Sequence, residues 1–532
     1  MNNASGNTKG LLSRPGDQHS YWQRVIGVDL RSLALFRIVI GIIVLIDLAW
    51  RSQTLVEMYT DEGFFTRDLA NLYYRSVSGS ESYSYWSIHK LSGAVEFQWL
   101  LFAISAIAAI CVTIGWKTRI ATVILWVLVA SVQTRNPLIN TSGDTLLKML
   151  LFWSMFLPTA AVWSIDSFRT RPPRRLWLAN FATAGIILQL CYMYWFTGIA
   201  KCNEVWYRGE ALHYVLQLEI YAKDFATTLA SSSWMMKLAS WATLVSELFF
   251  PALLFLPFFT SRFRWLNIAT FWCFHFMIFL SMEIGLFSFI SMAGWLPLIP
   301  ASIWEARWMP EMMRSSKMLG RRKSVGRPVR NFRLARQAVY YRYSASLLGN
   351  VVCGGLIVYF LFFNLANINS RMLPRQLVYV GASLNVNQHF QMFGVPPKES
   401  PWFVYEAQLV DGSSVDAFRD QALSYEKPES VRQSIPNHHW RKLHRNLARF
   451  TPKSLGEFRK SLAGYIAASW NKEHGPDQQI EYLKLTCFLD EIGPTASYGD
   501  QVTAVWGTVG KEPSIFDKAF EESMGGDNPF PF

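Results

Sequence analysis

Long apolar runs recur from residue 33 to residue 368, and they restrict what this chain can fold into. A helix needs about 20 mostly apolar residues to cross a bilayer. We therefore expect a polytopic α-helical membrane protein with about nine spans, followed by a water-soluble segment. The expected spans are 33–50, 95–115, 120–134, 146–164, 177–199, 237–259, 265–283, 286–302 and 347–367.

The distribution of basic residues predicts the orientation of these spans. Arginine and lysine gather in the N-terminal tail 1–32 and in every second link, of which the largest is 303–346. Cytoplasmic links are enriched in these residues. The alternation requires an odd number of spans, with a cytoplasmic N-terminus and an extracytoplasmic C-terminus in the cell (plasma or inner) membrane. Since the links account for the net charge of +13, we predict membrane lipid as a partner and no nucleic acid.

The segment 369–532 has the composition of a soluble α+β domain, distinct from the membrane domain 33–368. Alternating residues predict a strand at 403–409, and Asp411-Gly412 is a hairpin signal. Further strands are expected at 481–489 and 501–509, and helices at 438–450 and 455–471. The histidines His438, His439 and His444 fall on a polar helix and are expected to be solvated.

Ionisable residues inside the spans are candidates for function, because a charge in a bilayer is costly. Asp144 and Lys148 are four residues apart, which favours an ion pair on one helix face. Glu247 precedes Pro251 by one turn, so its carboxylate has the alternative of bonding backbone groups freed by the proline. Arg37 lies near the cytoplasmic end of its span, where its side chain can reach water.

Two further candidates share the seventh expected span. His275 and Glu283 are eight residues apart, which places them on a similar helix face. A buried histidine with a satisfied hydrogen bond is the structural alternative to a functional pair.

Lys201 ends an aromatic run, YWFTGIAKCNEVW, on the expected outer side. Apolar surroundings lower the pKa of a lysine and make it a usable base. The alternative is an interfacial anchor whose ammonium group reaches water.

The chain carries none of the common soluble catalytic motifs, and its cysteines and histidines lack metal-ligand spacing. We therefore predict no metal site. Cys202 and Cys487 are both expected outside the cytoplasm, where a disulfide between them is conceivable but no spacing pattern supports one.

Several motifs occur in an order that resembles one known family. They are SLALFRI at 32–38, YTDEG at 59–63, GWKTR at 115–119, NTSGD at 140–144, FH at 274–275, IGLFS at 284–288 and NQHFQMF at 387–393. This series resembles the horizontally transferred transmembrane domain (HTTM) family, which includes the vitamin K-dependent γ-glutamyl carboxylases. The resemblance runs from about residue 29 to the end of the chain.

The resemblance implies chemistry for two residues. In the carboxylases, a lysine in a Gly-x-x-Lys…Trp segment deprotonates reduced vitamin K. The oxyanion reacts with O2 to give a stronger base, which removes a γ-proton from glutamate before CO2 adds. Lys201 has the same offset from Gly198 and Trp206 as that lysine, and His275 matches a pocket histidine.

The other expected pocket residues are Asn140, Asp144, Trp206, Glu247 and Glu283. The chain departs from the carboxylases where Asn140 is followed by Thr141 instead of histidine, and where Ala200 replaces a second lysine.

Two functions from different classes follow. The first is a vitamin K-dependent γ-carboxylase-like enzyme that uses Lys201 on a reduced quinone, with O2 and CO2 as co-substrates. The second is a non-redox factor for maturation or export of secreted peptides, in which the pocket binds lipid or peptide. A transporter is disfavoured, because the chain lacks matching inverted repeats.

Overall fold

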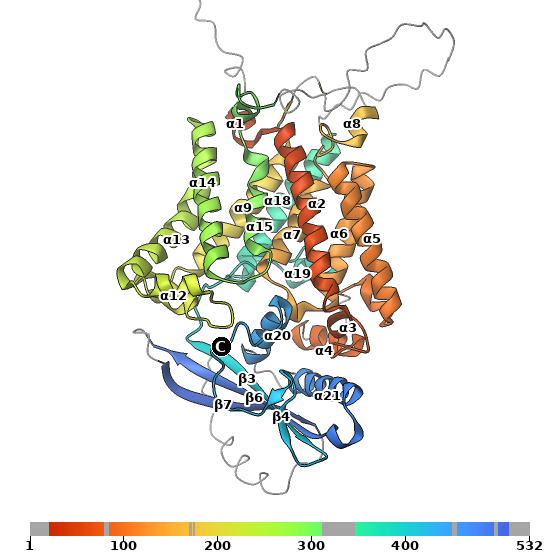
Figure 1. Ribbon diagram of the computed structural model, residues 1–532. Coiled ribbons are helices and arrows are strands. Elements are labelled where there is room, and N and C mark those ends of the chain that lie inside the picture. Colours follow the sequence, from red (N-terminus) through yellow and green to blue (C-terminus); the bar gives the residue numbers. More distant parts are fainter. Residues whose placement is uncertain are drawn as a thin grey trace, which may run out of the picture.

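A helical bundle and an antiparallel sheet make up the computed structural model (Figure 1). It describes residues 21–78, 85–169, 173, 176–310, 346–449, 455–493 and 498–509. The sheet lies at the opposite end of the bundle from α1 and α8. The main bundle helices are α2 (Leu30–Ser52), α5 (Val95–Ile114), α6 (Thr118–Arg135), α7 (Ser142–Ser154), α9 (Phe181–Ala200), α13 (Ser233–Leu253), α14 (Thr260–Ser281), α15 (Phe287–Gly294) and α18 (Leu347–Ala366).

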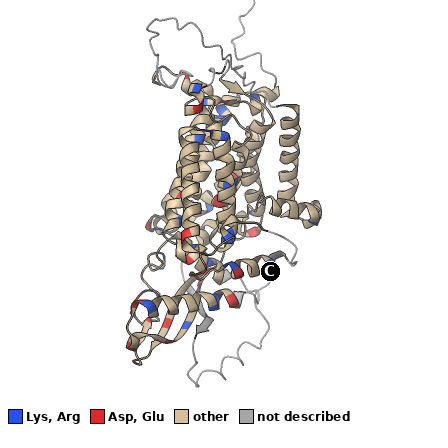
Figure 2. Ribbon diagram, turned by 90° about the vertical axis from the view of Figure 1, so that its right-hand side faces the viewer, with Lys and Arg blue, Asp and Glu red and all other residues tan. Residues whose placement is uncertain are grey.

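Within the described ranges, five helices are long and apolar enough to cross a membrane: α2, α5, α9, α14 and α18. Each coincides with an expected span, and Figure 2 shows long stretches of helix without charged residues. The chain therefore has the character of a membrane protein. The other expected spans fall on α6, α7, α13 and α15, of which α7 and α15 are short. The expected span 286–302 is interrupted after α15, where Pro297 lies in a 3-10 turn.

Smaller elements connect the bundle helices. They are α1 (Tyr21–Ile26), β1 (Val28–Asp29), α3 (Leu55–Tyr59), α4 (Arg67–Ser78), η1 (Ile88–Lys90), η2 (Pro137–Ile139), α8 (Ile165–Arg169), β2 (Trp177–Leu178), α10 (Glu204–Tyr207), α11 (Ala211–Leu216), α12 (Asp224–Ala230), η3 (Leu296–Leu298), α16 (Ala301–Trp304), η4 (Ser370–Met372) and α19 (Arg375–Ser383). The basic link 311–345 lies outside the described residues.

Arg37 fastens one end of the bundle and does not reach water. Its guanidinium is buried and donates to the carbonyl oxygens of Val112 at 2.7 Å and Thr113 at 2.8 Å. These carbonyls belong to the last turn of α5, whose final C=O groups have no partner within the helix. The expectation that Arg37 snorkels is therefore wrong, because the open end of α5 provides acceptors inside the protein.

The C-terminal residues form a five-stranded sheet in the order β5-β4-β3-β6-β7, with all neighbours antiparallel. Its elements are β3 (Glu399–Leu409), β4 (Ser414–Asp416), β5 (Gln421–Ala422), α20 (His438–Arg449), α21 (Leu455–Glu473), η5 (Pro476–Gln478), β6 (Ile480–Ile492) and β7 (Tyr498–Val509). The three long strands and both helices coincide with the predicted elements. All six cysteines are free, and Cys487 is buried opposite Phe403 in the sheet.

Helix α20 lies between the bundle and the sheet (Figure 1). On the bundle side, Asn446 Nδ2 donates to Leu138 O at 2.6 Å. On the sheet side, His444 is hydrogen-bonded to Tyr405 of β3. His439 and His444 are buried and His438 is half-buried. The prediction that these histidines are solvated is therefore wrong, because a polar helix is covered on two faces.

Candidate functional site

Lys201 and Glu247 form a buried ion pair at the end of α9. Lys201 Nζ donates to Glu247 Oε2 at 2.7 Å, and each side chain is only 3% exposed. The helices approach closely at Gly198, where an added Cβ would lie 3.2 Å from the Cβ of Glu247. The anchor interpretation of Lys201 is therefore wrong, because its ammonium group does not reach water. Glu247 was expected to bond backbone groups freed by Pro251, but its carboxylate pairs with Lys201 instead.

Trp206 packs beside the pair and connects it to the segment between α19 and β3. Lys201 Nζ lies 5.3 Å from the centroid of the Trp206 ring, which suits a cation–π contact. Trp206 Nε1 donates to the carbonyl oxygens of Phe393 and Gly394, each at 3.0 Å. The structure thus brings together three of the residues expected from the sequence: Lys201, which caps the end of α9, Trp206 on α10 and Glu247 on α13.

A buried pair of this kind can take up a proton. The shared proton can reside on either partner, and when it moves to Glu247 the Lys201 amine becomes a free base. The pair that has accepted a further proton carries a net positive charge, which would stabilise a nearby oxyanion. Removing one partner leaves an uncompensated charge, which typically costs about 3–5 kcal/mol.

His275 lies in a second buried polar group. Its Nε2 is 2.8 Å from Tyr194 Oη, and the same oxygen accepts a hydrogen bond from Trp295 Nε1 at 3.1 Å. The arrangement with the fewest unpaired groups has Tyr194 donate to Nε2, which places the imidazole proton on Nδ1. Within the described part of the chain, Nδ1 has no hydrogen-bond partner. His275 therefore holds a buried unused donor.

Sequence reasoning missed Tyr194, although a signal was present. Tyr194 precedes Lys201 by seven residues, or two helical turns, on α9. Positions with this spacing share a helix face. The tyrosine therefore stands on the lysine's side of the helix, and it links that face to His275.

Glu283 does not join His275. Helix α14 ends at Ser281, so the helical spacing that suggested a shared face does not extend to Glu283. Its carboxylate pairs with Arg432 at 2.9 Å and with Arg441. Burial alone would raise the pKa of Glu283, but the two arginines hold it below its usual value. Glu283 thus connects the link between α14 and α15 to α20, through Arg441, and to the segment before α20, through Arg432.

Asp144 and Asn140 belong to a third group. Asp144 caps α7 through the backbone N of Thr141 at 2.6 Å, and it pairs with Arg51 of α2. Lys148 donates instead to Asn387 Oδ1 at 3.4 Å. The expected Asp144–Lys148 ion pair is therefore wrong, because a buried arginine from another helix takes the carboxylate. Asn140 donates to Gln133 O at 2.7 Å.

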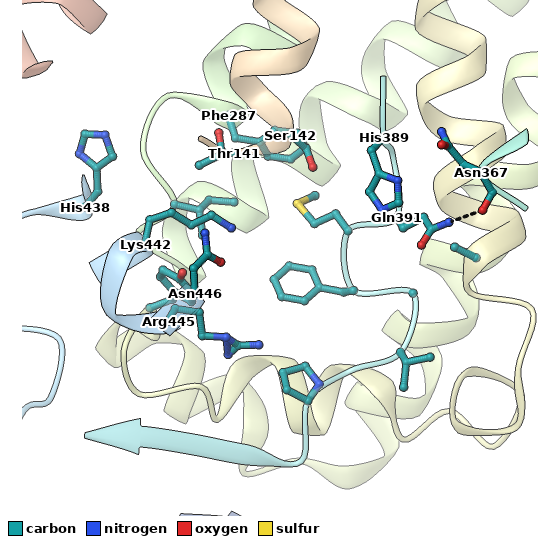
Figure 3. Close-up of a pocket in the computed structure, with 18 of the residues that line it drawn as sticks. Thr141, Ser142, Phe287, Asn367, His389, Gln391, His438, Lys442, Arg445 and Asn446 are labelled. Atoms are coloured by element: carbon teal, nitrogen blue, oxygen red, sulfur yellow. Dashed lines mark hydrogen bonds between the residues drawn. The ribbon is translucent and has the colours of Figure 1, made fainter. Parts of the chain in front are cut away.

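A cavity of about 670 Å³ opens where the bundle meets α20 (Figure 3). Of the residues expected from the sequence, Glu283 lines it. Ala200, which directly precedes Lys201, also lines it. So do Phe393 and Gly394, whose carbonyl oxygens accept from Trp206 Nε1. Phe287 also lines the cavity, and its ring centroid is 5.3 Å from that of His275. Lys201 and His275 therefore lie behind the cavity wall.

Among the described residues, no group of three or more His, Cys, Asp and Glu side chains is arranged to hold a metal ion. No curated protein matched the chain, and no solved structure matched it. The family model for the HTTM domain matches residues 27–304, which is just over half of the chain. These residues contain Lys201, Glu247 and His275. The chain belongs to the HTTM domain family.

Proposed function

We propose that this protein is a carboxylase-like membrane enzyme in which Lys201 acts as a base on a reduced quinone. The chain would cross the cell membrane nine times, with the N-terminus cytoplasmic and the domain 369–532 extracytoplasmic. The observation that carries the proposal is the buried Lys201–Glu247 pair beside the cavity where the bundle meets α20. Membership of the HTTM family and the offset of Lys201 from Gly198 and Trp206 support it.

The cavity suits the ring of a quinone. Ile199, Ile284 and Phe287 supply apolar wall, and the volume of about 670 Å³ lies in the range of small-molecule sites. A bound reduced quinone would supply an acidic hydroxyl and, with O2, the strong base needed to carboxylate glutamate with CO2. Lys201 does not line the cavity, so the Phe393–Gly394 segment would move to give a ligand access.

The residues of the chain would have distinct tasks. Glu247 would hold the shared proton while the Lys201 amine takes the proton of the ligand hydroxyl. The resulting positive charge would favour the oxyanion. His275 would be fixed by Tyr194, with its Nδ1–H available to orient a ligand once Phe287 moves.

A second function is favoured by one observation. Lys442 and Arg445 of α20 line the cavity, whereas Lys201, the predicted base, does not. This arrangement suits a non-redox factor for maturation or export of secreted peptides, whose pocket binds lipid or peptide.

Two measurements on the purified protein separate these functions. An organic extract is analysed for bound quinone, and oxygen uptake is recorded with added menaquinol, with and without CO2 and a glutamate peptide. The enzyme proposal predicts bound quinone and uptake above the rate without protein. Absence of both would reject the quinol chemistry and leave the peptide-maturation function.

A further inference from the structure

We propose that a second cavity, between the turn from α5 to α6 and the link from α7 to α8, binds an anionic phospholipid. The lipid phosphate would lie against Lys117 and Arg169, and an acyl chain would lie along α6. The leaflet concerned is at the end of the bundle opposite the sheet, which is the cytoplasmic leaflet in the topology proposed above. This inference does not rest on the quinol chemistry, because neither Lys201 nor His275 lines this cavity.

The cavity lies where the hydrocarbon core of a membrane would give way to headgroups. Helix α5 is one of the membrane-length helices and ends at Ile114, and Lys117 directly precedes α6. Trp116 is 39% exposed at this turn, and tryptophan is enriched at the level of the headgroups. The volume of about 460 Å³ is in the range of small-molecule sites. A lipid phosphate would therefore lie at the level of Lys117.

The lining of this cavity has an excess of positive charge. Three basic side chains, Lys117, Arg119 and Arg169, line it against one carboxylate, that of Asp166. Lys117 and Arg169 are exposed, and neither forms an ion pair within the described part of the chain. Lys117 Nζ lies 5.4 Å from the centroid of the Trp116 ring, a contact that leaves its N–H groups able to donate. An ammonium and a guanidinium group together suit a phosphate, which accepts charge-assisted hydrogen bonds.

The carboxylate of Asp166 is held at the start of α6. Its Oδ1 accepts from the backbone N of Lys117 at 2.9 Å, and its Oδ2 accepts from the backbone N and the hydroxyl of Thr118 at 2.9 and 2.8 Å. A helix N-terminus stabilises a negative charge in this position. The protein thus supplies its own anion for the helix end, and the excess cationic side chains are left for an anion from outside.

The wall of the cavity offers mainly apolar surface. Its hydroxyls donate inside the protein, as Thr122 does to Thr118 O and Ser154 to Leu150 O, each at 2.7 Å. The apolar lining consists of Ile120, Leu157, Pro158, Ala160 and Ala161. A sugar or a nucleotide base would find few partners for its polar groups here, whereas an acyl chain brings no polar group that needs one.

The apolar wall continues along the outside of α6. Ile120 is 62% exposed, and Val123 and Ile124 follow it as exposed residues three and four positions further on. This spacing places the three side chains on one helix face. An acyl chain that leaves the cavity therefore meets a continuous apolar surface. This continuity favours a lipid over a soluble phosphate as the source of the anion.

The test measures lipid binding to the full-length protein in dodecyl maltoside by native mass spectrometry, with phosphatidylglycerol, phosphatidylcholine and inorganic phosphate as probes. The cavity variants are Lys117→Gln/Arg169→Gln, which removes two exposed cations, and Ala160→Phe, which fills the cavity without a change of charge. The matched control is Arg24→Gln/Arg262→Gln. It removes the same charge from exposed positions of α1 and α14, which lie at the same end of the bundle and outside the cavity (Figure 1). Arg262 also lies over an aromatic ring, 4.9 Å from the centroid of Phe259.

We expect phosphatidylglycerol to bind the parent and the control more tightly than phosphatidylcholine does. Each glutamine in the cavity should weaken this preference by about fivefold, the usual contribution of a basic residue beside anionic lipid. Ala160→Phe should weaken phosphatidylglycerol binding as well. Equal binding of the two lipids by the parent, an unchanged preference in either cavity variant, or an equal loss in the control would overturn the proposal. Displacement of phosphatidylglycerol by inorganic phosphate would identify a soluble phosphate as the ligand and would also overturn it.

Discussion

Lys201 Nζ lies 2.7 Å from Glu247 Oε2, and both side chains are shielded from solvent. A lysine alone in such a place would lose its proton to escape the cost of desolvation. Its pairing with a carboxylate from a neighbouring helix makes the two groups one proton-handling unit. The base predicted from the sequence is therefore better described as Lys201 supported by Glu247.

Thermal unfolding in detergent tests whether the ion pair is structurally coupled. Lys201→Met and Glu247→Leu should each destabilise the protein by up to about 3–5 kcal/mol, because each leaves a buried ionisable group that must either stay charged without its partner or shift to its neutral form. The double variant should recover most of this loss, since it removes both charges. Additive losses in the double variant would show that the two groups do not interact.

Removal of the Tyr194 hydroxyl should destabilise the protein, because this hydroxyl is hydrogen-bonded to His275. Tyr194→Phe deletes the hydrogen bond to His275 Nε2 and leaves Trp295 Nε1 without its acceptor, at a cost of about 1–3 kcal/mol. Tyr192→Phe is the control, because its hydroxyl makes a longer bond of 3.3 Å to a backbone carbonyl on α18. Unfolding temperatures of both variants are compared with the parent. A larger loss in the control would contradict the assignment.

Acid should destabilise the contact between α20 and the sheet. Burial lowers the pKa of His444 to about 4, whereas an unfolded histidine titrates near 6.5. Between these values the unfolded chain binds more protons, so stability falls as the pH drops from about 6.5 to about 4. His444 alone would contribute roughly 3 kcal/mol across this window. The free energy of unfolding is measured in urea at several pH values and plotted against pH. His444→Gln should reduce the slope of this plot by the equivalent of about one proton. An unchanged slope would contradict the burial of a neutral histidine.

The sequence predicted elements better than it predicted contacts. The apolar runs located the helices because membrane-length helices are defined by local composition, and alternation located β3. The partner of Asp144 was not predictable in this way, because Arg51 lies on another helix and is distant in sequence. For Lys201, the local aromatic run indicated burial but could not indicate which residue of α13 faces it. The histidines of α20 looked solvated because the helix is polar, and only its place between bundle and sheet explains their burial.

The alternation of basic links predicts a topology in which the N-terminus is cytoplasmic and the sheet extracytoplasmic. A reporter that is active only outside the cytoplasm should be active when fused after Phe532. It should be inactive when fused at residue 320, in the basic link. Paired cytoplasmic reporters at the same positions serve as controls and should give the reverse pattern. Activity of both fusions on the same side would reject an odd number of spans.

The central claim is that Lys201 is the base, and paired variants test it through menaquinol-dependent oxygen uptake. Lys201→Arg keeps a cation opposite Glu247 but cannot supply a neutral nitrogen. Glu247→Gln keeps the shape of the site and leaves the lysine able to deprotonate. The account predicts that Lys201→Arg lowers the rate by about 100-fold or more, the usual contribution of a general base, while Glu247→Gln keeps a measurable rate. A parent-like rate in Lys201→Arg, with loss of the rate in Glu247→Gln, would contradict it.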